Sequence, residues 1–353
     1  MLQATNLRKE YGSLVAVDDV DLEIETGEFA TIVGPSGSGK STLLHMLAGH
    51  LEPTGGRITL DGTDITDTKP QERPTSLVFQ SWALFPHMTV RENIEFPIRT
   101  TGRSVDGQVE ELLEQVQLDP EIQADKNVSE LSGGQRQRVA LARSLAYDPD
   151  ILLLDEPLAS LDYVLQKQLQ RELADLNVEL DMTFVYVTHS LEAALVMSDK
   201  LFVIDEGDLI QTGPPEEIYR EPNNKFIAEF MGDANVFGVD LVEFDAGAAT
   251  VTSDEFEGSV TVPTHVDDEP SHLVVRHDDC VVEAELRRPI GAEVHVDNIL
   301  VRGNTVLVEC SSTTTDEDYV AEVDYDHFEE ASVAVGDTAY LQWEAEKSIL
   351  VPE

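Results

Sequence analysis

The stretch that most constrains the fold of this chain is GPSGSGKS, at residues 34–41. An apolar run typical of a buried strand, FATIVG, leads into it, and a segment with helical spacing, STLLHML, completes it. The stretch matches the pattern Gly-x-x-x-x-Gly-Lys-Ser/Thr, in which backbone N–H groups close around phosphate oxygens at a helix N-terminus. A chance match in a loop rich in glycine and serine is the alternative, which the strand–loop–helix context disfavours. The stretch therefore predicts a phosphate-binding loop in an α/β domain.

Two residues of this loop have specific expected roles. Lys40 is expected to reach the β- and γ-phosphates of a nucleotide, and Ser41 is expected to bind Mg²⁺. The loop residues expected to contact the nucleotide are Gly34, Pro35, Ser36, Gly37, Ser38, Gly39, Lys40, Ser41 and Thr42.

A second apolar run, ILLLDE at residues 151–156, ends in two carboxylates. Open parallel sheets bind ligands beyond the carboxyl ends of their strands, where these two residues are expected to lie. Asp155 would hold the metal ion, and Glu156 would orient and polarise an attacking water. An ordinary strand that ends in a solvated acidic pair is the alternative, and the presence of a phosphate loop makes it the weaker one.

A third stretch, LSGGQRQRVALARSLA at residues 131–146, contains no acidic residue. Ser132 has the position of an N-cap, and the glycines after it allow close backbone approach, so the helix would direct its positive end at an anion. This second phosphate-binding element should point away from the chain's own phosphate loop. If two copies pack head to tail, this helix of each copy would point at the phosphate that the loop of the other copy holds. The helix also carries Arg136, Arg138 and Arg143. Three interpretations of these arginines stay open: they lie on the helix surface without a specific role, they neutralise neighbouring acids, or they bind phosphate.

The chain has 353 residues and is expected to form two domains, at residues 1–234 and 235–353. In the first, buried-looking strands alternate with helical segments, which indicates an α/β fold with a parallel sheet. Turns in TLDGTDITD suggest an antiparallel sheet beside it, and helical spacing dominates between Pro86 and Asp150. From Asn235 onwards, short alternating runs between polar turns predict a small all-β barrel or sandwich.

The formal net charge of −46, from 69 acidic and 23 basic residues, disfavours binding to nucleic acid or to an anionic membrane. An acidic interaction or metal-binding surface is one explanation, and a surface adapted to very high salt is the other, which the even spread of Asp and Glu favours. Cys280 and Cys310 lack metal-site or disulfide spacing, which favours a reducing, cytoplasmic setting. Because no leader or bilayer-spanning apolar run is visible, the chain is expected to be soluble.

Together, the motifs resemble those of ATP-binding cassette proteins, the nucleotide-hydrolysing subunits of transporters, over about residues 2–232. The family's motifs occur in order: Walker A at 34–41, the Q-loop at Gln80, the signature at 131–135, Walker B at 151–155, Glu156, the D-loop LASLD ending at Asp162, and the switch His189. The resemblance implies a P-loop NTPase core of the RecA type with an antiparallel β subdomain and a helical subdomain. It also implies an ATP-sandwich dimer. In that dimer the partner copy's γ-phosphate is met by Ser132, Gly133, Gly134 and Gln135.

The resemblance also assigns roles to single residues, each with a plainer alternative. Tyr11 would stack on adenine, although an isolated Tyr in a strand is more often part of the core. His189 would contact the γ-phosphate as a polar sensor, although a lone His at a strand end is usually just solvated. Gln80 would touch Mg²⁺ or the attacking water. The implied catalytic set is Glu156, His189, Gln80 and Lys40, and the implied metal ligands are Ser41, Gln80 and Asp155.

The segment after Gln80, SWALFPHMTVRENIEF, carries several large apolar groups. They either pack in the core or form a groove for a helix of a membrane subunit. These groups are Trp82, Leu84, Phe85 and Met88.

Two strings, QERPTSLVFQSWALFPHM and PNNKFIAEFMGDANVF, resemble import ATPases of the polyamine, ferric-iron and sugar type, whose cassette is followed by a β-rich regulatory domain called TOBE. Trp82 stands where tyrosine is usual, and VVRHDDC replaces the usual Arg-Pro-Glu turn of the β domain. We therefore expect an importer ATPase at the cytoplasmic face of the membrane, acting as a homodimer with separate permease subunits and, indirectly, a solute-binding protein. A non-transport cassette ATPase of DNA repair or translation is the alternative. An exporter is disfavoured because no fused membrane span is visible.

Overall fold

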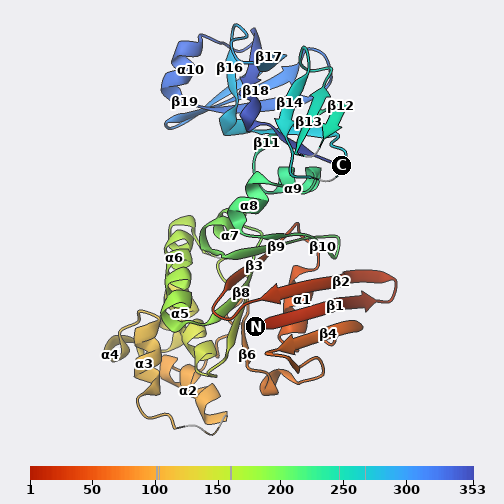
Figure 1. Ribbon diagram of the computed structural model, residues 1–353. Helices are drawn as coiled ribbons and strands as arrows, with labels where there is room; N and C mark the ends of the chain where they lie inside the picture. The colour runs from red at the N-terminus through yellow and green to blue at the C-terminus, as the bar shows by residue number, and fades with distance from the viewer. Residues whose placement is uncertain (101, 103, 160, 246, 267) are drawn as a thin grey trace. The chain divides into compact units, whose positions relative to one another are not determined.

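The computed structural model describes residues 1–353 except 101, 103, 160, 246 and 267. Its contacts divide the chain into two compact units, Met1–Pro215 and Glu216–Glu353 (Figure 1). This division falls earlier in the chain than the predicted boundary between residues 234 and 235, which stays a prediction. Within the described residues, no helix combines the length and the apolar character needed to cross a bilayer.

The first unit contains a sheet with strand order β10-β9-β3-β8-β7-β6, in which the strands from β9 to β6 run parallel and β10 is antiparallel. Side chains of β7 alternate between two apolar clusters, with Leu152 and Leu154 in one and Ile151 and Leu153 in the other. Burial on both faces explains the continuous apolar runs, and the predicted parallel sheet is confirmed. The strands are β3 (Phe29–Val33), β6 (Thr75–Val78), β7 (Ile151–Asp155), β8 (Thr183–Val187), β9 (Lys200–Asp205) and β10 (Asp208–Gly213).

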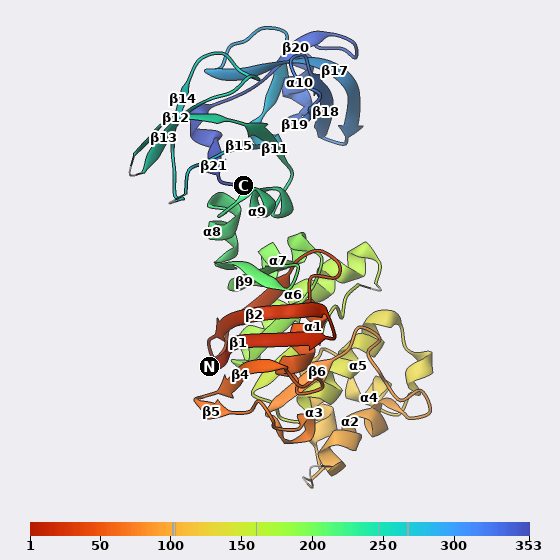
Figure 2. The same ribbon diagram turned by 90° about the vertical axis from the view of Figure 1, so that its right-hand side faces the viewer.

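An antiparallel sheet with the order β2-β1-β4-β5 lies beside α1 in both views of the molecule (Figures 1 and 2). Leu2 of this sheet, Leu43 of α1 and Ile32 of β3 belong to one buried cluster, so the two sheets and the helix share a core. The predicted antiparallel sheet is therefore confirmed. These elements are β1 (Leu2–Tyr11), β2 (Leu14–Ile24), β4 (Gly55–Leu60), β5 (Thr63–Asp64) and α1 (Lys40–Leu47).

Helices occupy the region between Pro86 and Asp150, as predicted, and α2, α3 and α4 lie together, away from β1 and β2 (Figures 1 and 2). Ile94 of α2 and Val139 of α5 join one apolar cluster with Leu152 and Leu173, so this region packs on the second face of the parallel sheet. The helices are α2 (Val90–Thr100), α3 (Gln108–Gln115), α4 (Pro120–Gln123), α5 (Gly133–Leu145), α6 (Tyr163–Leu180) and α7 (Leu191–Met197), with 3₁₀ turns η1 (Pro70–Glu72) and η2 (Val128–Glu130).

The second unit is rich in β-structure, as predicted, with strand orders β11-β15-β21, β12-β13-β14 and β16-β20-β17-β18-β19. Its core surrounds Trp343, whose ring centroid lies 4.8 Å from that of Phe237. The strands are β11 (Ala234–Gly238), β12 (Asp240–Asp245), β13 (Ala248–Thr252), β14 (Val260–Pro263), β15 (His272–Arg276), β16 (Val281–Glu283), β17 (Ile290–Arg302), β18 (Thr305–Ser312), β19 (Asp318–Asp324), β20 (Thr338–Trp343) and β21 (Ile349–Val351). The helical elements are α8 (Pro215–Arg220), α9 (Lys225–Phe230), α10 (Tyr325–Ala331), η3 (His277–Asp279) and η4 (Ala345–Lys347).

A buried arginine connects α8 and α9 to the β-structure of the second unit. Arg276 at the end of β15 donates from Nη1 to the carbonyl oxygens of Ala228, at 2.6 Å, and Gly232, at 3.0 Å. Its Nη2 donates to the carbonyl oxygen of Tyr219 at 2.9 Å, and its guanidinium lies 4.3 Å from the centroid of that ring. These bonds satisfy carbonyl groups at the ends of both helices, which explains why the helices group with the second unit.

The two cysteines also lie in the second unit, where both are free and buried, in agreement with the absence of a disulfide pattern. Burial raises the pKa of the Cys280 and Cys310 thiols to about 12. Both therefore stay protonated near neutral pH and are chemically inert.

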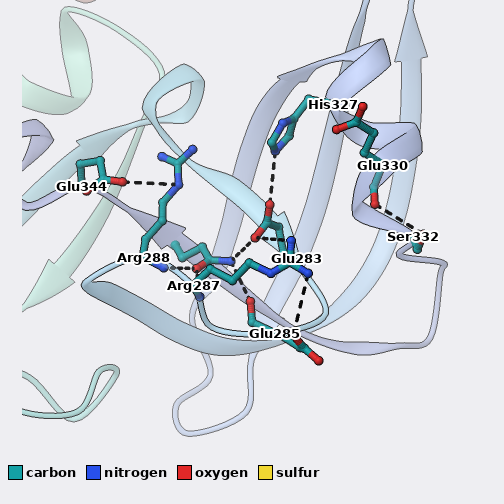
Figure 3. Close-up of polar contacts among 9 residues, drawn as sticks. Glu283, Glu285, Arg287, Arg288, His327, Glu330, Ser332 and Glu344 are labelled. Atoms are coloured by element: carbon teal, nitrogen blue, oxygen red, sulfur yellow. Dashed lines mark hydrogen bonds and ion pairs between the residues drawn. The ribbon is translucent and has the colours of Figure 1, made fainter.

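A polar cluster organises the loop after β16 in the second unit (Figure 3). The buried amide of Gln342 accepts hydrogen bonds from the backbone N–H groups of Arg287, at 2.7 Å, and Arg288, at 2.8 Å, and donates to Glu283 at 3.0 Å. His327 of α10 lies with its Nε2 3.6 Å from the other oxygen of Glu283. The loop has few apolar residues, so these hydrogen bonds, and not core packing, hold its backbone in place.

Candidate phosphate-binding and catalytic site

The loop between β3 and α1 can be built only with glycine at two positions. A Cβ at Gly34 would lie 2.0 Å from the carbonyl oxygen of Ile204, and one at Gly39 would lie 2.2 Å from that of Ala16. Gly39 is also the N-cap of α1 and has φ 100°, which favours glycine. No side chain caps α1 among the described residues, so N–H groups of its first turn are available to an anion.

Lys40 begins α1 and is directed back at its own loop. Its Nζ donates to the carbonyl oxygens of Gly34, at 2.9 Å, and Pro35, at 2.7 Å, and the residue is only 6% exposed. Burial lowers the pKa of Lys40, and the carboxylates of Glu156 and Asp155 oppose that shift. The structure therefore brings this lysine, the loop and the carboxyl end of β7 into one site, as the sequence predicts.

Ser41 and Asp155 meet across the site. Ser41 Oγ donates to Asp155 Oδ1 at 3.1 Å, and His45 Nε2 lies 3.4 Å from Asp155 Oδ2, without the alignment of a hydrogen bond. Hydroxyl and carboxylate oxygens are ligands that suit Mg²⁺, which commonly takes one or two protein ligands together with substrate phosphates. The pair therefore fits the metal that the sequence predicts.

His45 was not among the residues singled out from the sequence. It lies four positions after Ser41 on α1, so both side chains share one helix face. That spacing could have placed His45 near the expected metal ligands, although it does not reveal Asp155 as its neighbour.

Glu156 and His189 lie together because β7 and β8 are adjacent parallel strands, with Asp155 paired to Val187. The distance from Glu156 Oε2 to His189 Nδ1 is 3.2 Å. Glu156 has φ 44°, and its N–H donates to the carbonyl oxygen of Val187 at 3.1 Å, which holds this left-handed conformation. A carboxylate and an imidazole at hydrogen-bonding distance can position a water molecule and move a proton.

Ser132 caps α5, as the sequence predicts. Its Oγ accepts a hydrogen bond from the Gln135 N–H at 3.3 Å, and its own N–H donates to Gln135 Oε1 at 3.0 Å, which completes a capping box. A Cβ at Gly134 would lie 3.0 Å from Leu165, so this buried glycine also allows α6 to approach α5. Among the described residues, no hydrogen bond joins Ser132 to the loop at 34–41.

The three arginines of α5 interact within the chain. Arg138 pairs with Glu172 of α6, as the interpretation of neutralised neighbouring acids predicts. Arg143 instead donates to the carbonyl oxygens of Ala83, at 2.8 Å, and Trp82, at 3.0 Å, and Arg136 lies 5.8 Å from the centroid of the Trp82 ring. The bonds of Arg143 were not foreseen, because a backbone acceptor leaves no signal in the side-chain pattern.

The remaining predicted residues lie at or just beyond the ends of strands and helices. Tyr11 ends β1 and is 49% exposed, so the interpretation of it as a core residue is wrong. Lys9 Nζ lies 5.2 Å from the centroid of its ring, and stacking on adenine stays a prediction. Gln80 is exposed just after β6. Ser160 of the D-loop lies outside the described residues, whereas Asp162 caps α6 by accepting a hydrogen bond from Leu165 N–H at 3.0 Å.

The apolar segment after Gln80 is half-buried. Leu84 packs against the core of the first unit, which supports the interpretation of core packing for that residue. The Phe85 ring lies 5.0 Å from that of Phe96, and the buried Asn93 side chain binds the Phe85 N–H at 2.9 Å and carbonyl oxygen at 3.2 Å. The segment is therefore an ordered surface, and its role as a permease groove stays a prediction.

Comparisons with known proteins agree with these motifs. Residues 17–159 match the family model described as ABC transporter. A spermidine/putrescine import ATP-binding protein of Chromobacterium violaceum is 48% identical over 254 residues, covering 71% of this chain and 70% of that protein. A sulfate/thiosulfate import ATP-binding protein of Bacillus cereus is 37% identical over 361 residues, covering 100% of this chain and 98% of that protein.

Solved structures give the same result for the fold. An ATP-binding cassette solved as a dimer in a post-hydrolysis state with ADP and phosphate has a TM-score of 0.54 and 31% identity, covering 61% of this chain and 98% of that one. An ABC transporter subunit from Clostridium perfringens has a TM-score of 0.57 and 30% identity, covering 62% of this chain and 90% of that one. With a phosphate loop, a paired Glu and His and a capped signature helix in one unit, this chain belongs to the ABC transporter family of ATP-binding proteins.

Proposed function

We propose that this chain is the ATP-hydrolysing subunit of an importer, in which two copies close head to tail on two ATP molecules. The observation that carries the proposal is the cluster at the carboxyl ends of β7 and β8, where the Ser41–Asp155 pair lies beside the Glu156–His189 pair. Similarity to import ATP-binding proteins over most of their length supports the direction of transport.

In this proposal the loop at 34–41 binds the phosphates of ATP. The open N–H groups at the start of α1 donate hydrogen bonds to the phosphate oxygens, and Lys40 exchanges its carbonyl partners for the β- and γ-phosphates. Ser41 and Asp155, with Gln80 as a further ligand, would hold Mg²⁺, which would neutralise charge on the phosphate oxygens. Tyr11 stacks on the adenine.

Hydrolysis requires an oriented water molecule. Glu156 orients and polarises that water, and His189, 3.2 Å from the carboxylate, fixes its direction and contacts the γ-phosphate. Ser132 and the amides of Gly133, Gly134 and Gln135 contact the γ-phosphate held by the second copy. Turnover therefore depends on closure of the dimer, and closure moves the segment from Trp82 to Met88 against a permease.

Similarity to import ATP-binding proteins supports the proposed partners. The chain works at the cytoplasmic face of a membrane with separate permease subunits, and a solute-binding protein acts indirectly. The relatives named above import spermidine and putrescine or sulfate and thiosulfate, so the solute is among small charged compounds of this kind, ferric iron or sugars. The highly acidic surface is suited to very high salt, and assays belong in that medium.

Substitution of Glu156 by Gln tests the hydrolytic mechanism. Glu156→Gln should lower kcat by at least about a hundredfold, because the amide cannot take up a proton from water. ATP binding should persist, and a dimer that retains ATP should appear in size-exclusion chromatography. Lys40→Ala, in contrast, should lose ATP binding itself. Normal hydrolysis by Glu156→Gln would remove its assigned role.

Co-purification tests the importer assignment. The tagged protein, isolated at high salt from gently solubilised membranes, should retain a permease with several membrane spans, identified by mass spectrometry. Recovery of ribosomal or DNA-repair proteins alone would leave the ATPase chemistry intact and contradict the role in import.

A further inference from the structure

Trp82 connects three parts of the cassette that lie far apart in the sequence. Its indole Nε1 donates to the carbonyl oxygen of Pro157 at 3.1 Å, and Pro157 directly follows the proposed catalytic Glu156. Its ring lies 5.8 Å from the guanidinium of Arg136, and an ideal Cβ at Gly133 would be 3.7 Å from it. The segment after Gln80, the loop after β7 and the first turns of α5 therefore meet at one side chain.

The backbone at this point is held in a conformation that it would not adopt by itself. Trp82 has φ 59° and Ala83 has φ 46°, a left-handed region that residues other than glycine rarely adopt. Arg143 binds the carbonyl oxygens of both residues, and the Trp82 N–H donates to the Phe79 carbonyl oxygen at 2.8 Å. A local turn bond and the bonds from Arg143 of α5 therefore hold this conformation together.

We infer that Trp82 is a positioning residue that fixes Gln80 and the segment after it to the catalytic loop through the indole–Pro157 hydrogen bond. A shift of the loop that carries Glu156 then moves the Pro157 carbonyl, and the indole transmits that displacement to residues 80–83. Arg143 ties the same residues to α5, so movement of the signature helix reaches them as well. The inference deepens the proposed function and rests on it.

The decisive variant is Trp82→Phe, which keeps an aromatic ring beside Arg136 and removes the indole donor. Among the described residues, no hydrogen bond or ring contact joins Trp82 to the loop at 34–41, so ATP affinity measured in EDTA should stay within about twofold. With Mg²⁺, kcat should fall about tenfold at unchanged KM, because Gln80 and Glu156 are no longer held in register. Amide hydrogens of residues 81–85 should exchange faster, whereas those of β3 and α1 should not change.

The second tryptophan offers a matched control. Trp343 also donates its indole N–H, to Ser348 Oγ at 3.0 Å, and it lies in the second unit. Trp343→Phe should leave kcat and the exchange of residues 81–85 unchanged. Because the chain has two tryptophans, the emission of unsubstituted protein minus that of Trp82→Phe reports Trp82 itself, and ATP should change this difference.

Three results would overturn the inference. The first is unchanged kcat and unchanged exchange at residues 81–85 in Trp82→Phe. The second is an equal loss of ATP affinity and kcat with faster exchange throughout the cassette, which is what a merely structural residue would give. The third is Trp82 emission that is insensitive to ATP. Failure of the proposed function is separate, because it would appear as absent hydrolysis in the unsubstituted protein, where the exchange comparison still applies.

Discussion

The N-termini of α1 and α5 both carry backbone N–H groups without a partner inside the helix, but different groups bind these amides. At α1 the N-cap is Gly39, no described side chain caps the helix, and the chain supplies Lys40 beside the open N–H groups. At α5 the Ser132–Gln135 capping box closes the helix with its own side chains. The α1 end is thus incomplete until an anion arrives, whereas the α5 end is stable alone and adds to a site built elsewhere.

Substitution of a glycine in the loop before α1 should have the largest effect on ATP binding. Gly39→Ala should abolish ATP binding, with affinity at least about a hundredfold lower, because its Cβ would clash with the Ala16 carbonyl oxygen at 2.2 Å. Gly62→Ala is the matched control, since its φ is +76°, nothing lies within 4 Å of the added atom, and it lies outside the phosphate loop. The control should cost only about 1–2 kcal/mol of stability. Isothermal titration and thermal unfolding separate the two, and equal effects would contradict the steric argument.

A substitution at Ser132 separates capping from phosphate recognition at α5. Ser132→Asp keeps a strong N-cap, so the free energy of unfolding should change by no more than about 0.5 kcal/mol. Hydrolysis should nevertheless fall at least about tenfold, because the added carboxylate would repel the partner's γ-phosphate. ATP turnover and urea unfolding of the same sample measure both. Turnover at the unsubstituted rate would show that Ser132 acts only as a cap.

The smallest effect is expected at the other half of the capping box. Gln135→Ala leaves the exposed Ser132 N–H to water and should lower the free energy of unfolding by about 0.5 kcal/mol. The double variant with Ser132→Ala should lose less than the sum of the single losses, because the two side chains act as one unit. Additive losses in urea unfolding would indicate that the two bonds are independent.

Features encoded by local spacing could be predicted from the sequence. The Ser132 cap follows from a serine three residues before a glutamine, and the parallel strands follow from apolar runs such as residues 151–154. The meeting of Ser41 with Asp155 follows from a rule about the carboxyl ends of parallel strands. In each case a few neighbouring residues and one general rule are sufficient.

Contacts between distant side chains and main-chain groups could not be predicted in this way. The bonds of Trp82 to Pro157 and of Arg143 to Ala83 end on carbonyl groups, which every residue carries. The approach of His45 to Asp155 depends on how α1 lies beside β7. The sequence pattern of the second unit predicted strands, but their division among sheets depends on pairings across the whole unit.

The arginines that bind main-chain carbonyl groups have a consequence for how this chain tolerates salt. Exposed pairs such as Arg220 and Glu216, 3.0 Å apart, weaken as ionic strength rises, because at about 1 M salt the screening length is only about 3 Å. Arg276 is buried and Arg143 is half-buried, and both bind uncharged carbonyl groups, so their bonds are not ion pairs that dissolved salt would screen. The connections that these two residues make are therefore largely indifferent to ionic strength, while the acidic exterior responds to it.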